Sequence, residues 1–159
     1  MVNIKNRSEF IRNVNSLGFI QEEKDEIIIK NKDNKQIGWI SLKSENCFQI
    51  QMDNEHETFK IFLDFIDIKP TGKLTTKELL DNIKNLGYTY GLIKVLVGGK
   101  VWKAYNIFKN NSKVAFVEVD RAYTFNTISE ELEGLEDKKL FQEIINYSNT
   151  KLGDRKWKK

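Results

Sequence analysis

The stretches FIRNVNSLGF (residues 10–19) and LLDNIKNLGY (residues 79–88) decide the fold of this chain, because they are two versions of one pattern. Both place apolar residues at positions one, two, five and eight, followed by a glycine and an aromatic residue. This spacing predicts an amphipathic helix with one apolar face. The glycine after the last turn favours a left-handed helix cap, where a side chain would cost about 1 kcal/mol. A repeated pattern of this kind predicts an internal duplication.

Three short strands are predicted after each of these helices, because isoleucine-rich and alternating segments are typical of strands. They span residues 26–31, 36–43 and 47–53 in the first copy, and residues 92–97, 100–108 and 113–120 in the second. Gly98-Gly99 predicts a two-residue hairpin turn that needs positive φ at both positions.

A closing helix is predicted at the end of each copy, over residues 57–68 and 139–150. The predicted fold class is therefore α+β, with a tandem α-β-β-β-α unit, antiparallel three-stranded meanders packed on helices, and a pseudo-twofold arrangement of the two units. The predicted boundaries are a first unit at 1–68, a linker at 69–74, a second unit at 75–152 with an insertion at 121–136, and a basic tail at 153–159.

The composition is that of a soluble globular protein, with 40% hydrophobic and 31% charged residues in 159. No apolar run approaches the roughly 20 residues of a membrane span, and the first residues lack the apolar stretch of a secretory signal. A cytoplasmic location is therefore expected. Lys, Ile and Asn together supply 56 residues, a bias that indicates an AT-rich coding sequence and hence a low-GC bacterium or one of its phages.

The residues that usually carry catalysis are scarce. One cysteine, Cys47, and one histidine, His56, can form neither an internal disulfide nor a His/Cys metal site. Glycine-rich phosphate loops and common hydrolase motifs are absent from the sequence. We therefore expect a non-enzymatic protein without a cofactor or a bound metal.

A metal-dependent enzyme is the third hypothesis, and it would use Asp53 and Asp120. Each of these aspartates ends a predicted third strand, so the repeat would make their positions equivalent. Two converging carboxylates could hold Mg²⁺. The alternative is that each aspartate caps the end of its strand or the turn that follows it.

Aromatic and basic residues alternate in the second half, which carries a net charge of +6 while residues 1–68 carry −3. Trp102, Lys103 and Tyr105 lie in one predicted strand, with Trp102 on one face and the other two on the opposite face. Arg155 and Trp157 lie in the basic tail. These five residues are the candidate binding residues, and they could stack bases and contact phosphates. Packing of the aromatic residues against the helices is the alternative.

The segment NYSNTKLGDR (146–155) resembles the ending Y-[AS]-x-T-P-[IL]-x-[ED]-R of small uncharacterised proteins encoded by phages and prophages of Gram-positive bacteria. The matching residues are Tyr147, Thr150, Leu152, Asp154 and Arg155, while a lysine replaces the proline. The helix–meander–helix units are also similar to that family. The resemblance implies a phage accessory role and assigns no activity.

The leading interpretation is a phage or mobile-element accessory protein that binds a host or phage protein stoichiometrically and inhibits a host defence system. The main alternative is a nucleic-acid-binding module that uses the basic second half and the tail. A small ligand at the interface between the repeats is a further possibility within the non-catalytic class.

Overall fold

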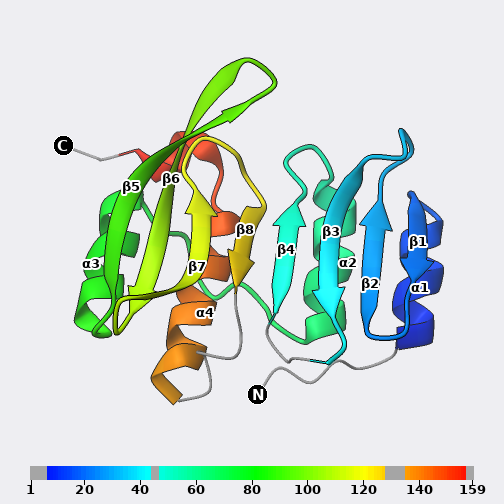
Figure 1. The fold of residues 1–159 in the computed structure, drawn as a ribbon, viewed down its shortest axis with the longest axis horizontal. Coiled ribbons are helices and arrows are strands. Elements are labelled where there is room, and N and C mark those ends of the chain that lie inside the picture. The colour runs from blue at the N-terminus through cyan, green and yellow to red at the C-terminus, as the bar shows by residue number, and fades with distance from the viewer. Residues whose placement is uncertain (1–6, 44–46, 128–134, 157–159) are drawn as a thin grey trace.

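Eight antiparallel strands form one continuous sheet with the strand order β1-β2-β3-β4-β8-β7-β6-β5 (Figure 1). The computed structural model describes residues 7–43, 47–127 and 135–156. The strands are β1 (Phe19–Glu22), β2 (Glu26–Lys30), β3 (Gln36–Ser41), β4 (Phe48–Gln51), β5 (Thr89–Val97), β6 (Lys100–Lys109), β7 (Ser112–Glu118) and β8 (Thr124–Thr127).

Four α-helices cover one face of this sheet and leave the other face open (Figure 1). They are α1 (Arg7–Asn15), α2 (His56–Ile66), α3 (Thr76–Asn85) and α4 (Leu135–Ser148), and the short 3-10 helix η2 (Leu152–Arg155) follows α4. The α+β class predicted from the sequence is confirmed. None of the helices in the described residues is long and apolar enough to cross a membrane.

The core lies between the sheet and the helices. In β4 the side chains of Phe48 and Ile50 are buried, whereas Gln49 and Gln51 are exposed, as strand alternation requires. Phe48 meets Phe62 of α2 edge-on and also contacts Phe141 of α4, so one central strand joins the helices of both halves.

Each half contains four strands, so the predicted three-stranded meanders are wrong. Both missed strands, β1 and β8, are four residues long. Strand β8 lies inside the predicted insertion 121–136, yet it pairs with β4 at the centre of the sheet. Its sequence TFNT carries only one apolar residue, and burial of its threonines beside Phe125 is a tertiary effect that local hydropathy does not reveal.

The additional strands change the predicted correspondence between the two halves. Counted from the start of each half, Asp53 follows the fourth strand, β4, whereas Asp120 follows the third strand, β7. The two aspartates therefore do not occupy equivalent positions in the element order.

The two glycines of the repeated pattern have different roles. Gly87 has φ +93°, which confirms the left-handed cap predicted after α3. Gly18 does not have a positive φ; a Cβ there would lie 2.3 Å from the carbonyl oxygen of Lys30. Gly18 is thus required for close backbone approach, and the left-handed cap predicted at this position is wrong.

The predicted linker, residues 69–74, lies along α4 and is fixed by hydrogen bonds. The Asn146 side chain accepts from the Thr71 amide, and Thr150 Oγ1 accepts from the Leu74 amide. The next residue, Thr75, is the N-cap of α3 in a reciprocal capping box with Glu78.

Candidate functional site

The β5–β6 hairpin extends beyond the other strands and beyond the helices that cover the sheet (Figure 1). Its strands contain nine and ten residues, and their register is regular from Thr89↔Phe108 to Val97↔Lys100. The turn at Gly98 and Gly99 has φ values of +58° and +79°, as predicted.

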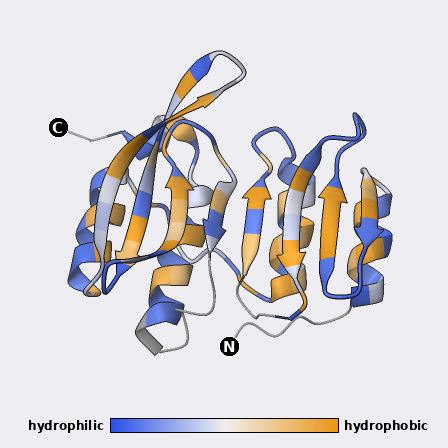
Figure 2. Ribbon diagram, viewed as in Figure 1, coloured by the Kyte–Doolittle hydropathy of each residue, from blue (hydrophilic) through white to orange (hydrophobic). Residues whose placement is uncertain are grey.

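One face of this hairpin exposes apolar side chains between lysines. Leu96 and Val101 are register partners with exposed fractions of 72% and 61%, and Leu92 is 54% exposed. Lys94 and Lys103 are also partners, and residues at alternate positions share one face of a strand. Figure 2 shows apolar and hydrophilic segments alternating along this hairpin.

We call this surface the hairpin patch, and it includes two residues from the C-terminal segment. Its residues are Leu92, Lys94, Leu96, Val101, Lys103, Leu152 and Lys156. Of the five large hydrophobic side chains exposed in the described residues, four belong to this patch, and the fifth is Phe19. Concentrated exposed apolar surface is typical of an interaction site.

A pocket of about 560 Å³ lies at the base of the hairpin patch, and we call it the Tyr105 pocket. Strands β5 and β6, the end of β7, the start of α3 and the η2 segment enclose it. Its lining residues are Thr76, Leu92, Lys103, Tyr105, Val119, Asp120, Leu152, Gly153, Arg155 and Lys156. The volume lies within the range of small-ligand pockets.

Tyr105 is the central polar group of this pocket. Burial raises the pKa of Tyr105, with a further contribution from the neighbouring Tyr90, whose ring meets it edge-on at 5.5 Å. The Tyr105 hydroxyl therefore stays protonated at neutral pH and can donate a hydrogen bond into the pocket.

Trp102 lies on the opposite face of the hairpin, as the sequence predicts. Its ring lies 5.3 Å from the guanidinium carbon of Arg121, and Arg121 is paired with the buried carboxylate of Glu118. The Trp102 ring thus packs against Arg121, and Trp102 and Tyr105 lie on opposite faces of the hairpin and do not form one aromatic platform.

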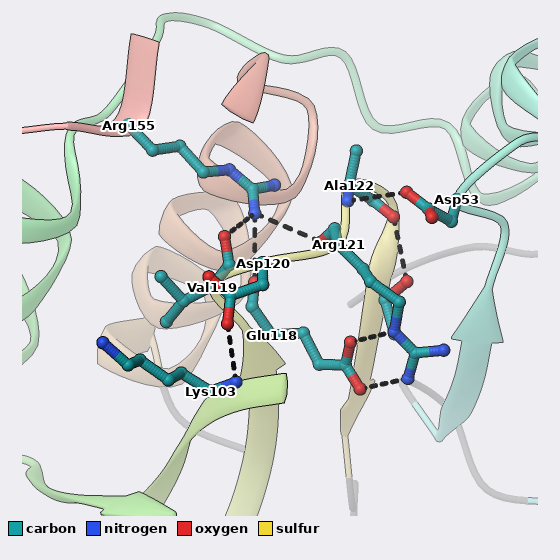
Figure 3. Close-up of polar contacts among 9 residues, drawn as sticks. Asp53, Lys103, Glu118, Val119, Asp120, Arg121, Ala122 and Arg155 are labelled. Atoms are coloured by element: carbon teal, nitrogen blue, oxygen red, sulfur yellow. Dashed lines mark hydrogen bonds and ion pairs between the residues drawn. The ribbon is translucent and has the colours of Figure 1, made fainter. Parts of the chain in front are cut away.

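A smaller cleft of about 300 Å³ lies beside Trp102, and we call it the Trp102 cleft. Residues of both halves line it, including Lys35 and Asp53 from the first and Lys100 and Arg121 from the second. The third guanidinium nitrogen of Arg121 points away from Glu118 (Figure 3). Cations and carboxylates are mixed in this cleft, so it has no single charge preference.

Arg155 is not a surface residue, which corrects its predicted role as an exposed contact. The side chain is only 2% exposed, and its guanidinium donates to six backbone carbonyls. Three of these belong to Glu118, Val119 and Arg121 in the β7–β8 connection (Figure 3), and three follow at the end of α4. Burial lowers the pKa of Arg155 from its usual high value, opposed by the nearby Tyr147. Arg155 thus joins the end of α4 to the end of β7 and its connection to β8.

The C-terminal motif forms one connected network. The Tyr147 ring lies 4.3 Å from the Arg155 guanidinium, and the Tyr147 hydroxyl contacts the Thr76 hydroxyl at 2.9 Å. The Thr150 hydroxyl donates to the Asn146 carbonyl, and the Thr150 carbonyl accepts a hydrogen bond from Arg155. The spacing of tyrosine, threonine and arginine in this motif is therefore explained by structure alone.

Asp53 and Asp120 each bind a backbone amide. Asp53 accepts from the Ala122 amide at 3.1 Å, and Asp120 accepts from the Lys103 amide at 2.7 Å (Figure 3). Both bonds run to segments that are distant in the sequence, so neither is a cap of the turn that follows the aspartate's own strand. Within residues 7–43, 47–127 and 135–156, no three His, Cys, Asp or Glu side chains form a group that could hold a metal ion.

The other residues considered in the sequence have ordinary positions. Cys47 is a half-buried free thiol. His56 is exposed at the start of α2, and its Nδ1 lies 2.8 Å from the Tyr123 hydroxyl. Trp157 lies outside the described residues.

Sequence reasoning missed the exposed apolar residues of the hairpin patch, Leu92, Leu96 and Val101. A signal was present, because apolar residues alternate with lysines on both sides of the Gly98-Gly99 turn. Alternation alone does not show which face the helices leave uncovered.

No protein-family model matches this chain. Neither a curated protein nor a solved structure matches it.

Proposed function

We propose that this chain is a non-enzymatic protein that acts by stoichiometric binding to another protein through the hairpin patch. The observation that carries this proposal is the gathering of Leu92, Leu96 and Val101 on one exposed face of a regular hairpin. Exposing these side chains to water has an unfavourable free energy that burial against a partner would relieve.

The charges of the patch favour a partner with an acidic and apolar surface. Lys94, Lys103 and Lys156 are exposed on or beside the patch. The adjoining pocket contributes one carboxylate, that of Asp120, so the lysines outnumber it on this surface. Acidic groups on the partner would accelerate encounter and orient it on the patch.

Nucleic acid is the second candidate, because these same lysines could contact phosphates. Sequence-tolerant binding of single strands also needs aromatic faces on which bases stack. The exposed apolar residues of the patch are aliphatic, while Trp102 is packed against Arg121 on the other face. A protein partner therefore agrees better with the chemistry of the surface.

The proposal includes a duplicated origin with a pseudo-twofold axis between β4 and β8. The helix–four strands–helix order occurs twice, and the sheet order reads symmetrically from its centre. A small ligand at the interface between the halves would occupy the Trp102 cleft, which residues from both halves line.

The biological setting that we propose is that of a phage or mobile-element accessory protein that inhibits a host defence system. Its support is the resemblance of residues 146–155 to phage and prophage proteins. Because Tyr147 and Arg155 act structurally, any specificity for a target would lie in other residues, such as those of the hairpin patch.

The test is capture of partners by the tagged protein from nuclease-treated lysate of a low-GC Gram-positive bacterium. Leu96→Asp should remove a discrete captured protein, while Phe19→Asp should retain it. Phe19 is the matched control, because it is an exposed apolar residue on β1, at the other edge of the sheet. Loss of all captured material on nuclease treatment would instead favour the nucleic-acid candidate.

A further inference from the structure

Strand β5 is a long edge of the sheet. Among the described residues it pairs only with β6, and it runs for nine residues, whereas the opposite edge strand β1 has four. Its sequence TYGLIKVLV contains no proline and a single lysine. Proteins commonly shorten edge strands or interrupt them with proline and charge, and β5 retains a long pairing surface.

The backbone groups that point outward from β5 can be assigned from β6. The Lys103 amide donates to Asp120, and the Lys103 carbonyl accepts from the Val119 amide, so both groups of Lys103 face the β7 side. In an antiparallel pair, the register partner of such a residue also points its N–H and C=O away from the ladder. Lys94, the partner of Lys103, therefore presents both groups at the outer edge.

The same geometry applies two residues away on either side. Leu92 and Leu96 present outward amides and carbonyls as Lys94 does, because the β5–β6 register is uninterrupted. Their side chains belong to the hairpin patch, and Leu92 also lines the Tyr105 pocket. Backbone pairing and side-chain recognition are thus available on one strand.

We propose that β5 binds an extended acidic segment of a partner protein by addition of a ninth strand to the sheet. This inference rests on the proposed function and specifies its mode of binding. The added strand would bond the outward groups of Leu92, Lys94 and Leu96, place an acidic residue opposite Lys94, and place apolar residues beside the two leucines.

Charge selects this occupant over a second copy of the chain. Two copies joined through β5 in the register centred on Lys94, the middle of the three residues with outward groups, would bring the Lys94 side chains of both strands together on one face, next to Lys103 of each hairpin. Like charges that face each other across strands are destabilising, whereas an acidic residue would be stabilised there.

The test uses the synthetic peptide acetyl-TLTETLT-amide, which places Leu, Glu and Leu on one face of a strand. Backbone hydrogen exchange of the full-length protein is followed by NMR with and without the peptide. We expect exchange of the Leu92, Lys94 and Leu96 amides to slow by about tenfold or more at saturation. The control peptide acetyl-TLTKTLT-amide should bind about tenfold more weakly.

Two variants separate charge from backbone pairing. Lys94→Gln removes the charge and keeps the amide, so it should weaken binding and still allow slowed exchange at Leu92 and Leu96. Lys94→Pro removes the outward amide without removing a β5–β6 hydrogen bond, so it should abolish binding. The wild-type exchange measurement remains decisive if the proline variant does not fold.

Three results would overturn the inference. The first is that the glutamate peptide does not bind, or binds without slowing exchange at the β5 edge, although capture of a partner from lysate still depends on Leu96. This outcome would leave the hairpin patch as the binding site and reject strand addition. The second is equal binding of the two peptides, and the third is a dimer of the free protein with these edge amides already protected.

Discussion

At the residue scale, Arg155 shows how this fold surrounds a buried positive charge with backbone carbonyls. Six backbone carbonyls surround the guanidinium, and the face of Tyr147 covers it. The carbonyls at the end of α4 carry the negative end of the helix dipole, which favours a cation there. Arginine suits this position because its planar group directs five N–H donors in fixed directions.

Arg155→Lys should therefore lower the free energy of unfolding by about 3 kcal/mol, since an ammonium has three donors and would leave buried carbonyls unsatisfied. Urea unfolding followed by circular dichroism measures the change. Lys156→Gln is the control, because Lys156 is exposed and the change should stay within about 0.5 kcal/mol. Equal stability of the two variants would mean that the carbonyl network contributes little.

Tyr147 makes the stability of the folded state depend on pH in the alkaline range. Burial raises the pKa of Tyr147 above the usual 10.0, and the Thr76 hydroxyl and Arg155 oppose this only in part. The unfolded chain therefore releases the tyrosine proton more readily than the folded one, and stability is lost as pH rises through and beyond 10.

We expect the urea midpoint of the wild-type protein to fall between pH 9 and pH 11. Tyr147→Phe should start lower, because it loses the contact with Thr76, and should fall less steeply over the same range. Parallel curves for the two proteins would assign the alkaline loss to other groups.

At the scale of elements, Gly18 and Gly87 occupy matching positions in the sequence, but the fold requires each glycine for a different geometric reason. The Cβ of an alanine at position 87 would have no neighbouring atom within 4 Å, so the only cost of this substitution is the strained φ of +93°. Ala at Gly18 would collide with the Lys30 carbonyl in the strand that pairs with β1.

Gly87→Ala should cost about 1 kcal/mol of unfolding free energy, the usual penalty of a left-handed conformation. Gly18→Ala should cost more, about 2 kcal/mol or above, because two backbones must separate. Urea unfolding of the two variants side by side measures the difference. A larger loss at Gly87 would contradict this assignment.

The sequence predicted the long elements better than the short ones. The repeated helices, the closing helices and the strands from β2 to β7 follow apolar periodicity, which local sequence carries. Strands β1 and β8 have only four residues each, with two apolar residues in β1 and one in β8. Strand β8 is also fixed by pairing with β4, more than 70 residues away. Missing them also produced the false equivalence of Asp53 and Asp120.

The candidate site was predictable only in part for a similar reason. Strand alternation correctly separated Trp102 from Lys103 and Tyr105. Alternation did not show that the hairpin extends beyond the helices. Leu96 and Val101 are exposed because they lie in this extended part. Nor could alternation show that the arginine of a basic tail turns inward to bind carbonyls.

At the scale of the whole molecule, the two ends of the sheet differ. The end at β1 is short and acidic residues predominate in its half, while the end at β5 is long and lies in the basic half. The proposed binding role therefore belongs to the half of the sheet whose β5–β6 hairpin extends beyond the other strands (Figure 1).

We propose that a protein partner covers the hairpin patch. The most direct measurement is hydrogen–deuterium exchange of the chain free and in complex with the protein that it captures from nuclease-treated lysate. We predict reduced exchange in residues 89–105 and 152–156, with little change around Phe19. Protection confined to the Trp102 cleft, or to the open face of β2–β4, would contradict the account.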